Sequence, residues 1–285
     1  MNIKEVLVNT EKYFKKNDID SPRLDAEVLL AELLGMERIK LYVNFDYPLK
    51  DKEISKYREM IKKRAQHIPV AYIIGHKEFM SLDFDVNQNV LLPRPETEIL
   101  VEYLIDYFQE KDMDSINIVE VGTGSGAIMV SLGHYLDNAR ILGVEIEEGA
   151  IEVTRQNIDK FNLEDRLKVT KGDLLNPLIK REISNVDLLV SNPPYISEED
   201  MDKLPPEVKQ EPDKALYGGR EGLDIYKDLI PQARKVLKDN GMIALEIGYN
   251  QAEAVSNILK ENNFKDLELR KDYADKDRFI IAYKG

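Results

Sequence analysis

The segment Ile116-Asn117-Ile118-Val119-Glu120-Val121-Gly122-Thr123-Gly124-Ser125-Gly126 is an apolar run that leads directly into a glycine-rich turn. Such a run is typical of a buried strand, and glycines after it let the backbone approach a ligand where a helix begins. Strand and helix patterns then alternate to the C-terminus, with strands expected at 140–146, 167–170, 186–190, 242–247, near 267 and at 279–283, and helices expected after 126 and at 148–157, 224–237 and 251–262. This alternation predicts an α/β fold, a doubly wound Rossmann-like sheet that is mostly parallel, with helices on both faces. Ligands bind such sheets at the carboxyl ends of the strands.

The composition narrows the class of protein. The chain has 285 residues, of which 43% are hydrophobic and 33% charged, as in globular proteins with one large or two ordinary domains. Its net charge of −13 argues against binding along a phosphate backbone, because that affinity comes from lysine and arginine. The absence of cysteine excludes disulfides, thiolate zinc sites and thiol nucleophiles. We expect no metal site, no signal peptide, no membrane span and a cytoplasmic location.

The N-terminal part differs from the rest. Residues 2–66 carry apolar residues at helical spacing, Ser21-Pro22 is typical of a helix start, and a further helix is expected at about 51–66. Two β-prone runs, 70–74 and 79–84, flank Gly75 and suggest a hairpin between two domains. The predicted organisation is therefore a helical domain at 1–68, a β-hairpin linker at 69–90 and the α/β domain at 91–285.

The sequence Asn192-Pro193-Pro194-Tyr195 follows the expected strand at 186–190. Because the two prolines lack N–H groups and favour extended backbone before them, Asn192 and Pro193 are expected to present oxygen atoms outward. A planar NH₂ group could then donate to the Asn192 side-chain oxygen and to the Pro193 carbonyl, with the ring of Tyr195 beside it. The alternative interpretation is an ordinary tight turn, since Asn-Pro and Pro-Pro are common in loops.

Three other loops lie at expected strand ends. Residues 122–126 suit the close approach of a nucleoside ligand, and Glu145 ends the next strand, where an acid can accept from ribose hydroxyls. Asp173 and Leu174 follow the third strand and are placed to meet an adenine edge, while Gly172-Asp173 as an ordinary turn is the alternative. Because Gly122, Gly124 and Ala127 also satisfy the looser fingerprint G-x-G-x-x-G/A, a nicotinamide or flavin protein remains an alternative.

The combination of these loops with Asn192-Pro193-Pro194-Tyr195 resembles the HemK/PrmC family of peptide chain release factor N5-glutamine methyltransferases. The resemblance extends over essentially the whole chain, through the segments 72–79, 92–98, 122–126, 192–195, 215–219 and 222–224. The sequence departs from the family pattern at Glu120, where aspartate is common, and at Glu145-Ile146-Glu147-Glu148, where Asp-Ile-Ser-Pro is usual. Both departures keep the charge and add a methylene group.

The resemblance implies a function and a set of site residues. The enzyme would transfer a methyl group from S-adenosylmethionine to the amide nitrogen of the glutamine in the Gly-Gly-Gln motif of class I release factors, leaving S-adenosylhomocysteine. The donor would be held by Gly122, Thr123, Gly124, Ser125, Gly126, Glu145, Asp173, Leu174 and Asn192. Asn192, Pro193, Pro194 and Tyr195 would bind the substrate, with Asn192, Pro193 and Tyr195 as the catalytic residues and no dedicated general base.

Other expectations complete the interpretation. The long segment 191–222 is expected to help form the peptide pocket, and the helical domain to recognise the substrate protein, with a monomer and no direct nucleic-acid partner. The main alternative is a methyltransferase acting on exocyclic amino groups of nucleic acids, which shares Asn-Pro-Pro-Tyr and would need a basic channel. A non-enzymatic binding domain or a dehydrogenase fits the sequence less well.

Overall fold

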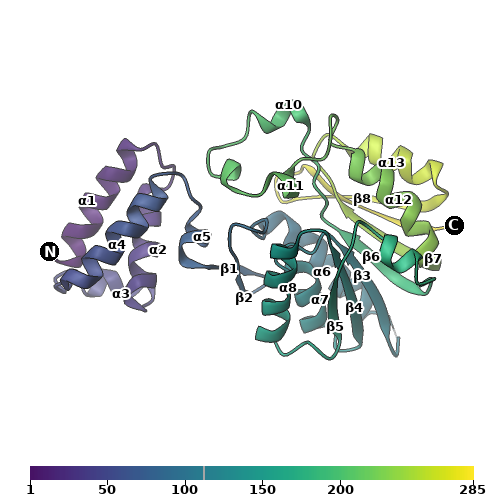
Figure 1. Ribbon diagram of the computed structural model, residues 1–285, viewed down its shortest axis with the longest axis horizontal. Helices are drawn as coiled ribbons and strands as arrows, with labels where there is room; N and C mark the ends of the chain where they lie inside the picture. The colour runs from purple at the N-terminus through teal and green to yellow at the C-terminus, as the bar shows by residue number, and fades with distance from the viewer. Residues whose placement is uncertain (112) are drawn as a thin grey trace. The chain divides into compact units, whose positions relative to one another are not determined.

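The structure is a computed structural model that describes residues 1–111 and 113–285 (Figure 1). The chain divides into two compact units, one formed by Met1–His76 with Pro205–Gln210 and the other by Lys77–Leu204 with Glu211–Gly285. The segment 205–210 thus belongs to the first unit, although it lies between parts of the second in sequence. The domain boundaries after residues 68 and 90 stay predictions.

The first unit is helical, as predicted. It contains α1 (Ile3–Lys16), α2 (Pro22–Leu34), α3 (Arg38–Val43), α4 (Asp51–Arg64) and α5 (Val70–Ile74). Helix α1 begins with a capping box between Asn2 and Glu5, and α2 begins at a proline, as the sequence indicated. Apolar side chains of these helices form a core of their own, among them Ile3, Leu7, Phe14, Leu29, Leu30 and Tyr57.

Charged residues of this unit are buried too, among them Arg64, Asp25 and Glu27. The Arg64 side chain is only 2% exposed, and its Nε donates to Asp25 Oδ2 at 2.7 Å. The same guanidinium pairs with Glu207, which lies in the segment 205–210. Burial raises the pKa of Asp25 above its ordinary value, while Arg64 lowers it. The lysines and arginines of α4 are therefore not all on a solvated face.

The hairpin after the helical region is displaced from its predicted position. Residues 70–74, expected as a strand, form helix α5, which ends at Gly75 in the left-handed region. The hairpin consists of β1 (His76–Phe79) and β2 (Leu82–Asp85), and its turn at Met80 and Ser81 has positive φ. The prediction of a strand at 70–74 was wrong because β-branched and aromatic residues have only a weak preference for strands, which packing overrides.

The second unit is built on a seven-stranded sheet, which confirms the predicted doubly wound fold. The strand order is β5-β4-β3-β6-β7-β9-β8, and within this sheet β9 pairs antiparallel with both β7 and β8 while the other described pairs are parallel. The strands are β3 (Ile116–Val121), β4 (Ala139–Glu145), β5 (Leu167–Lys171), β6 (Val186–Ser191), β7 (Leu237–Glu246), β8 (Phe264–Lys271) and β9 (Asp277–Lys284). The strand order reverses direction between β3 and β6, and such a switch point is where open α/β sheets bind ligands.

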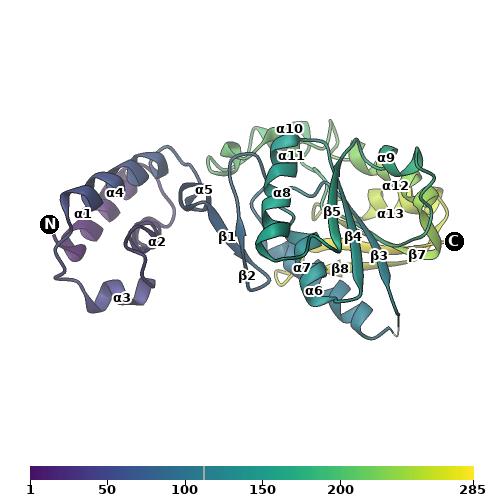
Figure 2. The same cartoon turned by 60° about the horizontal axis from the view of Figure 1, so that its bottom comes forward.

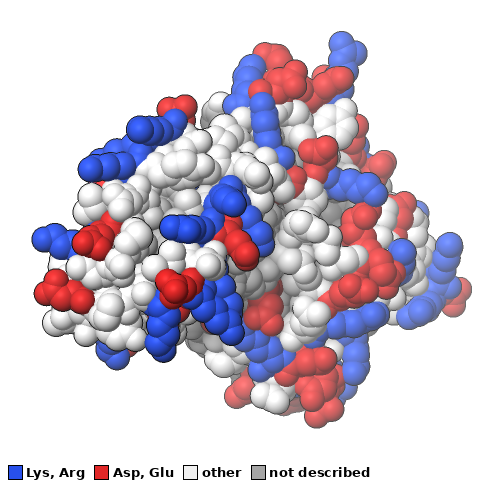
Figure 3. Space-filling view, turned by 60° about the vertical axis from the view of Figure 1, so that its left-hand side comes forward, with Lys and Arg blue, Asp and Glu red and all other residues white. Residues whose placement is uncertain are grey.

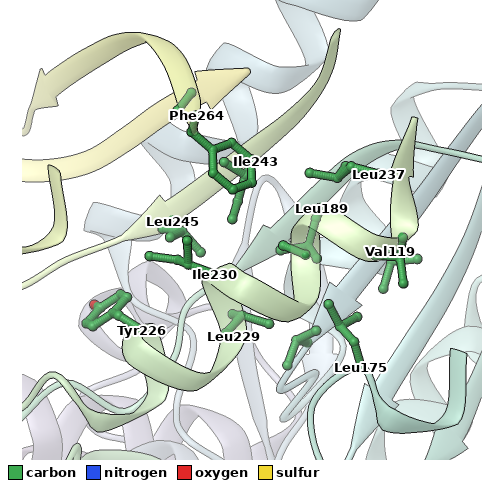
Figure 4. Packing of buried hydrophobic residues seen from close by; sticks show 14 of the residues in the cluster. Val119, Leu175, Leu189, Tyr226, Leu229, Ile230, Leu237, Ile243, Leu245 and Phe264 are labelled. Carbon is green, nitrogen blue, oxygen red and sulfur yellow. The ribbon is translucent and has the colours of Figure 1, made fainter. Parts of the chain in front are cut away.

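Helices cover both faces of the sheet (Figure 2). One face carries α6 (Pro95–Gln109), α7 (Ala127–Tyr135) and α8 (Glu148–Lys160), and the other carries α9 (Asn176–Ile179), α12 (Asp224–Val236) and α13 (Ala252–Glu261). Figure 4 shows Tyr226, Leu229 and Ile230 of α12 against Leu189 and Ile243 of the sheet. Each such buried side chain stabilises the fold by roughly 1.5–3 kcal/mol.

The long segment after β6 has little regular structure. It contains only short helices, namely α10 (Glu198–Met201), the 3₁₀ helix η1 (Val208–Gln210) and α11 (Asp213–Leu216). Gln251 Nε2 donates to the backbone oxygens of Tyr195 and Gly222, both at 3.0 Å, and so ties the two ends of the segment together. No described helix has the length and apolar composition that crossing a bilayer requires.

Candidate functional site

A cavity in the second unit lies at the carboxyl ends of β3, β4, β5 and β6. Because these strands are parallel neighbours, the loops that follow them meet at one edge of the sheet. The hydroxyl of Ser191 donates to the backbone oxygen of Val121 at 2.7 Å and joins the ends of β3 and β6. Of the predicted site residues, the cavity wall includes Gly122, Thr123, Gly124, Ser125, Glu145, Asp173, Leu174, Asn192, Pro193 and Pro194.

The glycine-rich turn needs glycine for its backbone. Gly122, Gly124 and Gly126 have φ of +75°, +54° and +80°, a region that residues with a Cβ rarely adopt. A Cβ built at Gly122 or Gly124 would meet no heavy atom within 4 Å, so open space faces both. Gly126 differs, since its Cβ would lie 3.1 Å from the side chain of Thr154, and it does not belong to the cavity wall as described. Its part in the predicted site is to begin helix α7.

Glu145 is fixed by the backbone around it. Its Oε2 accepts from the N–H of Gly124 at 3.0 Å, and its Oε1 accepts from the N–H groups of Ile146 and Glu147 at 2.8 and 3.1 Å. A carboxylate has about four acceptor positions, so three bonds leave capacity for a ligand hydroxyl. Glu145 therefore orders the glycine-rich turn and also faces the cavity.

A second acid, Glu120, lies beneath the same turn. It is 1% exposed, and its Oε2 accepts from the N–H of Met129 at 3.0 Å. Burial raises the pKa of Glu120 well above its ordinary value, and the nearby Glu145 raises it further. Glu120 therefore holds a proton more tightly than an exposed glutamate does.

The loop after β5 brings Asp173 and Leu174 to the cavity wall. Leu174 has φ of +49°, in the left-handed region that costs a non-glycine residue energy. Asp173 Oδ2 accepts from the side chain of Asn176 at 3.4 Å, a long contact for a hydrogen bond. An apolar side chain beside a carboxylate suits a flat aromatic heterocycle with an amino group.

Asn192, Pro193 and Pro194 line the cavity, and Asn192 is half-buried. Tyr195, expected beside them, does not belong to the cavity wall among the described residues. Its side chain instead packs against the core shared with α12, and burial raises its pKa. The structure thus brings three of the four residues of this motif to the cavity, and the predicted contact of Tyr195 with a substrate amide gains no support from its placement.

Sequence reasoning missed a hydrogen-bond chain behind Asn192. Its Nδ2 donates to Thr97 Oγ1 at 3.2 Å, and Thr97 Oγ1 donates to Glu246 Oε2 at 2.6 Å. Thr97 lies in the first turn of α6 and Glu246 ends β7, and both are buried. The available signal was Glu246 itself, a carboxylate at the end of an otherwise apolar strand.

A second missed residue is Glu211. Its carboxylate is almost fully buried and accepts from the N–H of Leu92 at 3.1 Å and from Arg94 Nη2 at 2.5 Å. Arg94 is thus paired with Glu211. The pair joins the extended segment before α6 to the loop before α11, and both line the cavity.

The charge around the cavity is not basic. Among the described residues its wall includes two cationic side chains, Arg94 and Lys214, and both are paired, with Glu211 and Glu147 respectively. Four acids line the same wall, at positions 120, 145, 147 and 173. On the face drawn in Figure 3, basic and acidic side chains are interspersed. The cavity lacks the excess of positive charge that a nucleic-acid backbone requires.

These features fit a nucleoside with a short charged tail. The wall offers open space at two glycines, a carboxylate with a free acceptor position, and an apolar residue beside an acid. Such a set suits the ribose, the adenine and the amino-acid part of S-adenosylmethionine. The residues that would hold it are 122–125, Glu145, Asp173 and Leu174.

Comparison with known proteins gives matches along the whole chain. Residues 5–75 match the PrmC N-terminal domain, and residues 112–279 match a methyltransferase domain. A release factor glutamine methyltransferase of Clostridium botulinum is 43% identical over 100% of both chains, and one of Clostridium acetobutylicum is 40% identical over 100% of this chain and 99% of its own.

Solved structures share the fold at low sequence identity. A methyltransferase from Pyrococcus furiosus has a TM-score of 0.54 with 18% identity, covering 81% of this chain and 99% of its own. The hMettl16 catalytic domain, crystallised with a MAT2A 3′UTR hairpin, has a TM-score of 0.56 with 18% identity over 82% of each chain. At this identity the likeness concerns the fold alone.

Proposed function

The chain belongs to the release factor glutamine methyltransferase family, and from this premise we propose that it methylates the side-chain amide nitrogen N5 of the glutamine in the Gly-Gly-Gln motif of class I release factors. The methyl donor of the family is S-adenosylmethionine. The observation that carries the proposal is that Asn192 lies on the same cavity wall as the glycine-rich turn and Glu145. A donor and an amide can thus meet in one cavity.

The donor side of the cavity, which we define as residues 122–125, Glu145, Asp173 and Leu174, would hold S-adenosylmethionine, and Gly126 would support it by starting helix α7. When bound, this cofactor supplies a methyl group made electrophilic by its sulfonium. Glu145 would accept from the ribose through its remaining acceptor position, and Asp173 with Leu174 would contact the adenine. S-adenosylhomocysteine is the expected product, and we propose that the reaction needs no metal.

The acceptor side, which we define as Asn192, Pro193 and Pro194, would hold the substrate amide. An amide nitrogen is a poor nucleophile because its lone pair is delocalised into the carbonyl. The Asn192 side-chain oxygen and the Pro193 carbonyl can each accept one N–H of the amide and so orient its nitrogen. Orientation of this kind contributes up to roughly 7 to 11 kcal/mol in well-aligned reactions. The two acceptors also stabilise the positive charge that develops on nitrogen.

The same two acceptors account for selectivity. A glutamate side chain would bring an anion to two oxygens and offer no hydrogen to them. A site built to accept an N–H rejects an analogue that lacks it by about 10⁴ to 10⁵. We therefore propose that glutamine is methylated and glutamate is not.

Further parts of the proposal concern the protein as a whole. We propose that it acts in the cytoplasm as a monomer, that the helical unit recognises the release factor, and that the segment after Asn192 contributes to the peptide pocket. The paired cations of the cavity support a protein substrate over a nucleic acid. Tyr195 beside the amide stays a prediction, since its ring packs on the core.

Radiolabelled S-adenosylmethionine tests the function. The protein is mixed with the labelled donor and either a class I release factor or total RNA, with a release factor whose motif glutamine is replaced by glutamate as the control. We expect label in the unmodified release factor only. Label in RNA, with none in the release factor, would establish the alternative of a nucleic-acid amino-group methyltransferase.

A further inference from the structure

Asn192, Thr97 and Glu246 form a chain of hydrogen bonds in which each side chain donates to the next. Thr97 has a single hydroxyl hydrogen, and its Oγ1 lies 2.6 Å from Glu246 Oε2. An ionised carboxylate only accepts, so that hydrogen is given to Glu246. The lone pairs of Thr97 Oγ1 then remain as the partner for Asn192, and they require the NH₂ end of the Asn192 amide at 3.2 Å.

The fold places these three residues together. Strands β6 and β7 are parallel neighbours with Ser191 opposite Leu245, so the next residues along, Asn192 and Glu246, leave the sheet side by side. Thr97 comes from the first turn of α6, where its N–H is already bonded to the backbone oxygen of Arg94 at 3.0 Å. Its side chain is 4% exposed and therefore cannot exchange these partners for water.

We propose that Thr97 and Glu246 are positioning residues, which hold the Asn192 amide with its NH₂ group inward and its oxygen available to the substrate glutamine. The inference rests on the proposed function of Asn192 as an acceptor. If the amide were rotated by half a turn, its NH₂ group would face the substrate NH₂, and two donors would oppose each other. Thr97 and Glu246 thus determine whether the site accepts or repels an amide.

The protonation state of Glu246 determines the direction of these hydrogen bonds. Burial raises the pKa of Glu246 to about 7, although Thr97 and Arg278 lower it. The other groups that face it are Glu96 and Tyr195, together with the Tyr226 hydroxyl, which donates to the Glu246 backbone oxygen at 2.7 Å. When Glu246 is protonated it can donate to Thr97, the Thr97 hydrogen then turns to Asn192, and the amide rotates. Turnover is expected to fall as the pH drops through 7.

The experiment measures kcat, KM for the release factor and the dissociation constant of S-adenosylhomocysteine. Thr97→Val removes the hydroxyl and keeps the shape, and we expect kcat to fall roughly 10- to 100-fold through misplacement of Asn192. Donor affinity should stay within about twofold, since the donor side is untouched. Thr97→Ser, which keeps the hydroxyl, should restore most of the activity. In Glu246→Gln the fall of kcat between pH 8 and pH 6 should be absent.

Ser131→Ala is the matched control, because Ser131 is a buried hydroxyl without a hydrogen-bond partner among the described residues. It should leave kcat unchanged. The inference is overturned if Thr97→Val keeps wild-type kcat, if Thr97→Ser is no better than Thr97→Val, or if Glu246→Gln keeps the pH dependence. Asn192→Ala distinguishes the proposed role of Asn192 from the proposed role of Thr97 and Glu246. If Asn192→Ala retains turnover, the proposed role of Asn192 fails. If Asn192→Ala loses turnover while Thr97→Val stays active, the role of Asn192 stands and only the positioning by Thr97 and Glu246 is refuted.

Discussion

At the ends of β3 and β4 the polar groups of the cavity wall are held by backbone N–H groups, whereas at the ends of β6 and β7 they are held by other side chains. Glu145 accepts from the backbone at Gly124, Ile146 and Glu147. Asn192 depends on Thr97, which in turn depends on Glu246. The donor side is therefore held by backbone groups, while the acceptor side depends on Glu246, whose pKa is about 7.

Asn192→Ala should distinguish the acceptor side from the donor side most clearly, because we expect it to lower kcat and to leave donor affinity almost unchanged. The variant removes one of two acceptors for the developing charge, and the loss of one such group lowers kcat by about 10² to 10³. Donor affinity should change by less than about twofold, because no donor-side residue bonds to the Asn192 side chain. Isothermal titration with S-adenosylhomocysteine and single-turnover methylation measure the two quantities. Equal loss of both would mean that Asn192 holds the donor only.

The titrating group on the acceptor side also has a consequence for stability. The pKa of Glu246 rises from its ordinary value of 4.5 to about 7 in the folded protein. The folded state therefore binds the proton more tightly than the unfolded state does. The stability that this contributes is fully present below pH 4.5 and is lost as the pH rises through 7. Glu246→Gln removes this pH dependence. Between pH 4.5 and pH 8 the free energy of unfolding of the variant should therefore rise by about 3 kcal/mol relative to that of the wild type.

Urea unfolding of wild type and Glu246→Gln at the two pH values measures this difference. Glu268→Gln is the control, since Glu268 lies on the same sheet with its side chain 42% exposed. It should give no comparable change. A parallel pH dependence of wild type and Glu246→Gln would show that Glu246 does not titrate in this range.

On the donor side the corresponding variant is Glu145→Ala. It removes a carboxylate that would accept from the ribose, and hydrogen bonds of this kind are worth roughly 1.5 to 3 kcal/mol, so donor affinity should fall about tenfold or more. Turnover at saturating donor should remain close to that of the wild type. Glu148→Ala is the control, because Glu148 is exposed and pairs with Lys171. Unchanged donor affinity in Glu145→Ala would place the ribose elsewhere.

The smallest effect is expected from Gly124→Ala. Its φ of +54° is strained for alanine, which should destabilise the fold by about 1 to 2 kcal/mol. The added Cβ would stand in the open space of the cavity and weaken donor binding as well. Gly35→Ala, with φ of +61° at the end of α2, carries the same strain away from the cavity. Equal donor affinity in the two variants would contradict the placement of the donor at the glycine-rich turn.

The difference between the two sides also explains what the sequence could predict. The glycine-rich turn and Glu145 depend on neighbours in sequence and on the strand pattern, so their place at the cavity followed from the alternation of strands and helices. The link from Asn192 to Thr97 spans 95 positions, and that from Thr97 to Glu246 spans 149. Neither local preference nor periodicity carries information over such distances.

The wrong prediction at residues 70–74 and the placement of Tyr195 have the same origin. Residues 70–74 were expected as a strand from their β-branched composition, but packing in the first unit makes them helix α5. Tyr195 is expected to offer a flat face to the substrate amide, and its contact with the core that includes α12 leaves this role a prediction. In both cases the sequence indicates the kind of residue, and tertiary contacts decide where its side chain lies.

The most direct test of the central claim is a crystal structure with S-adenosylhomocysteine and a peptide that contains the Gly-Gly-Gln motif. The account predicts the glutamine amide nitrogen within hydrogen-bonding distance of the Asn192 side-chain oxygen and the Pro193 carbonyl, with the product sulfur on the side of residues 122–126. A glutamine bound with its amide away from Asn192, or a product whose sulfur points away from Pro193, would contradict it.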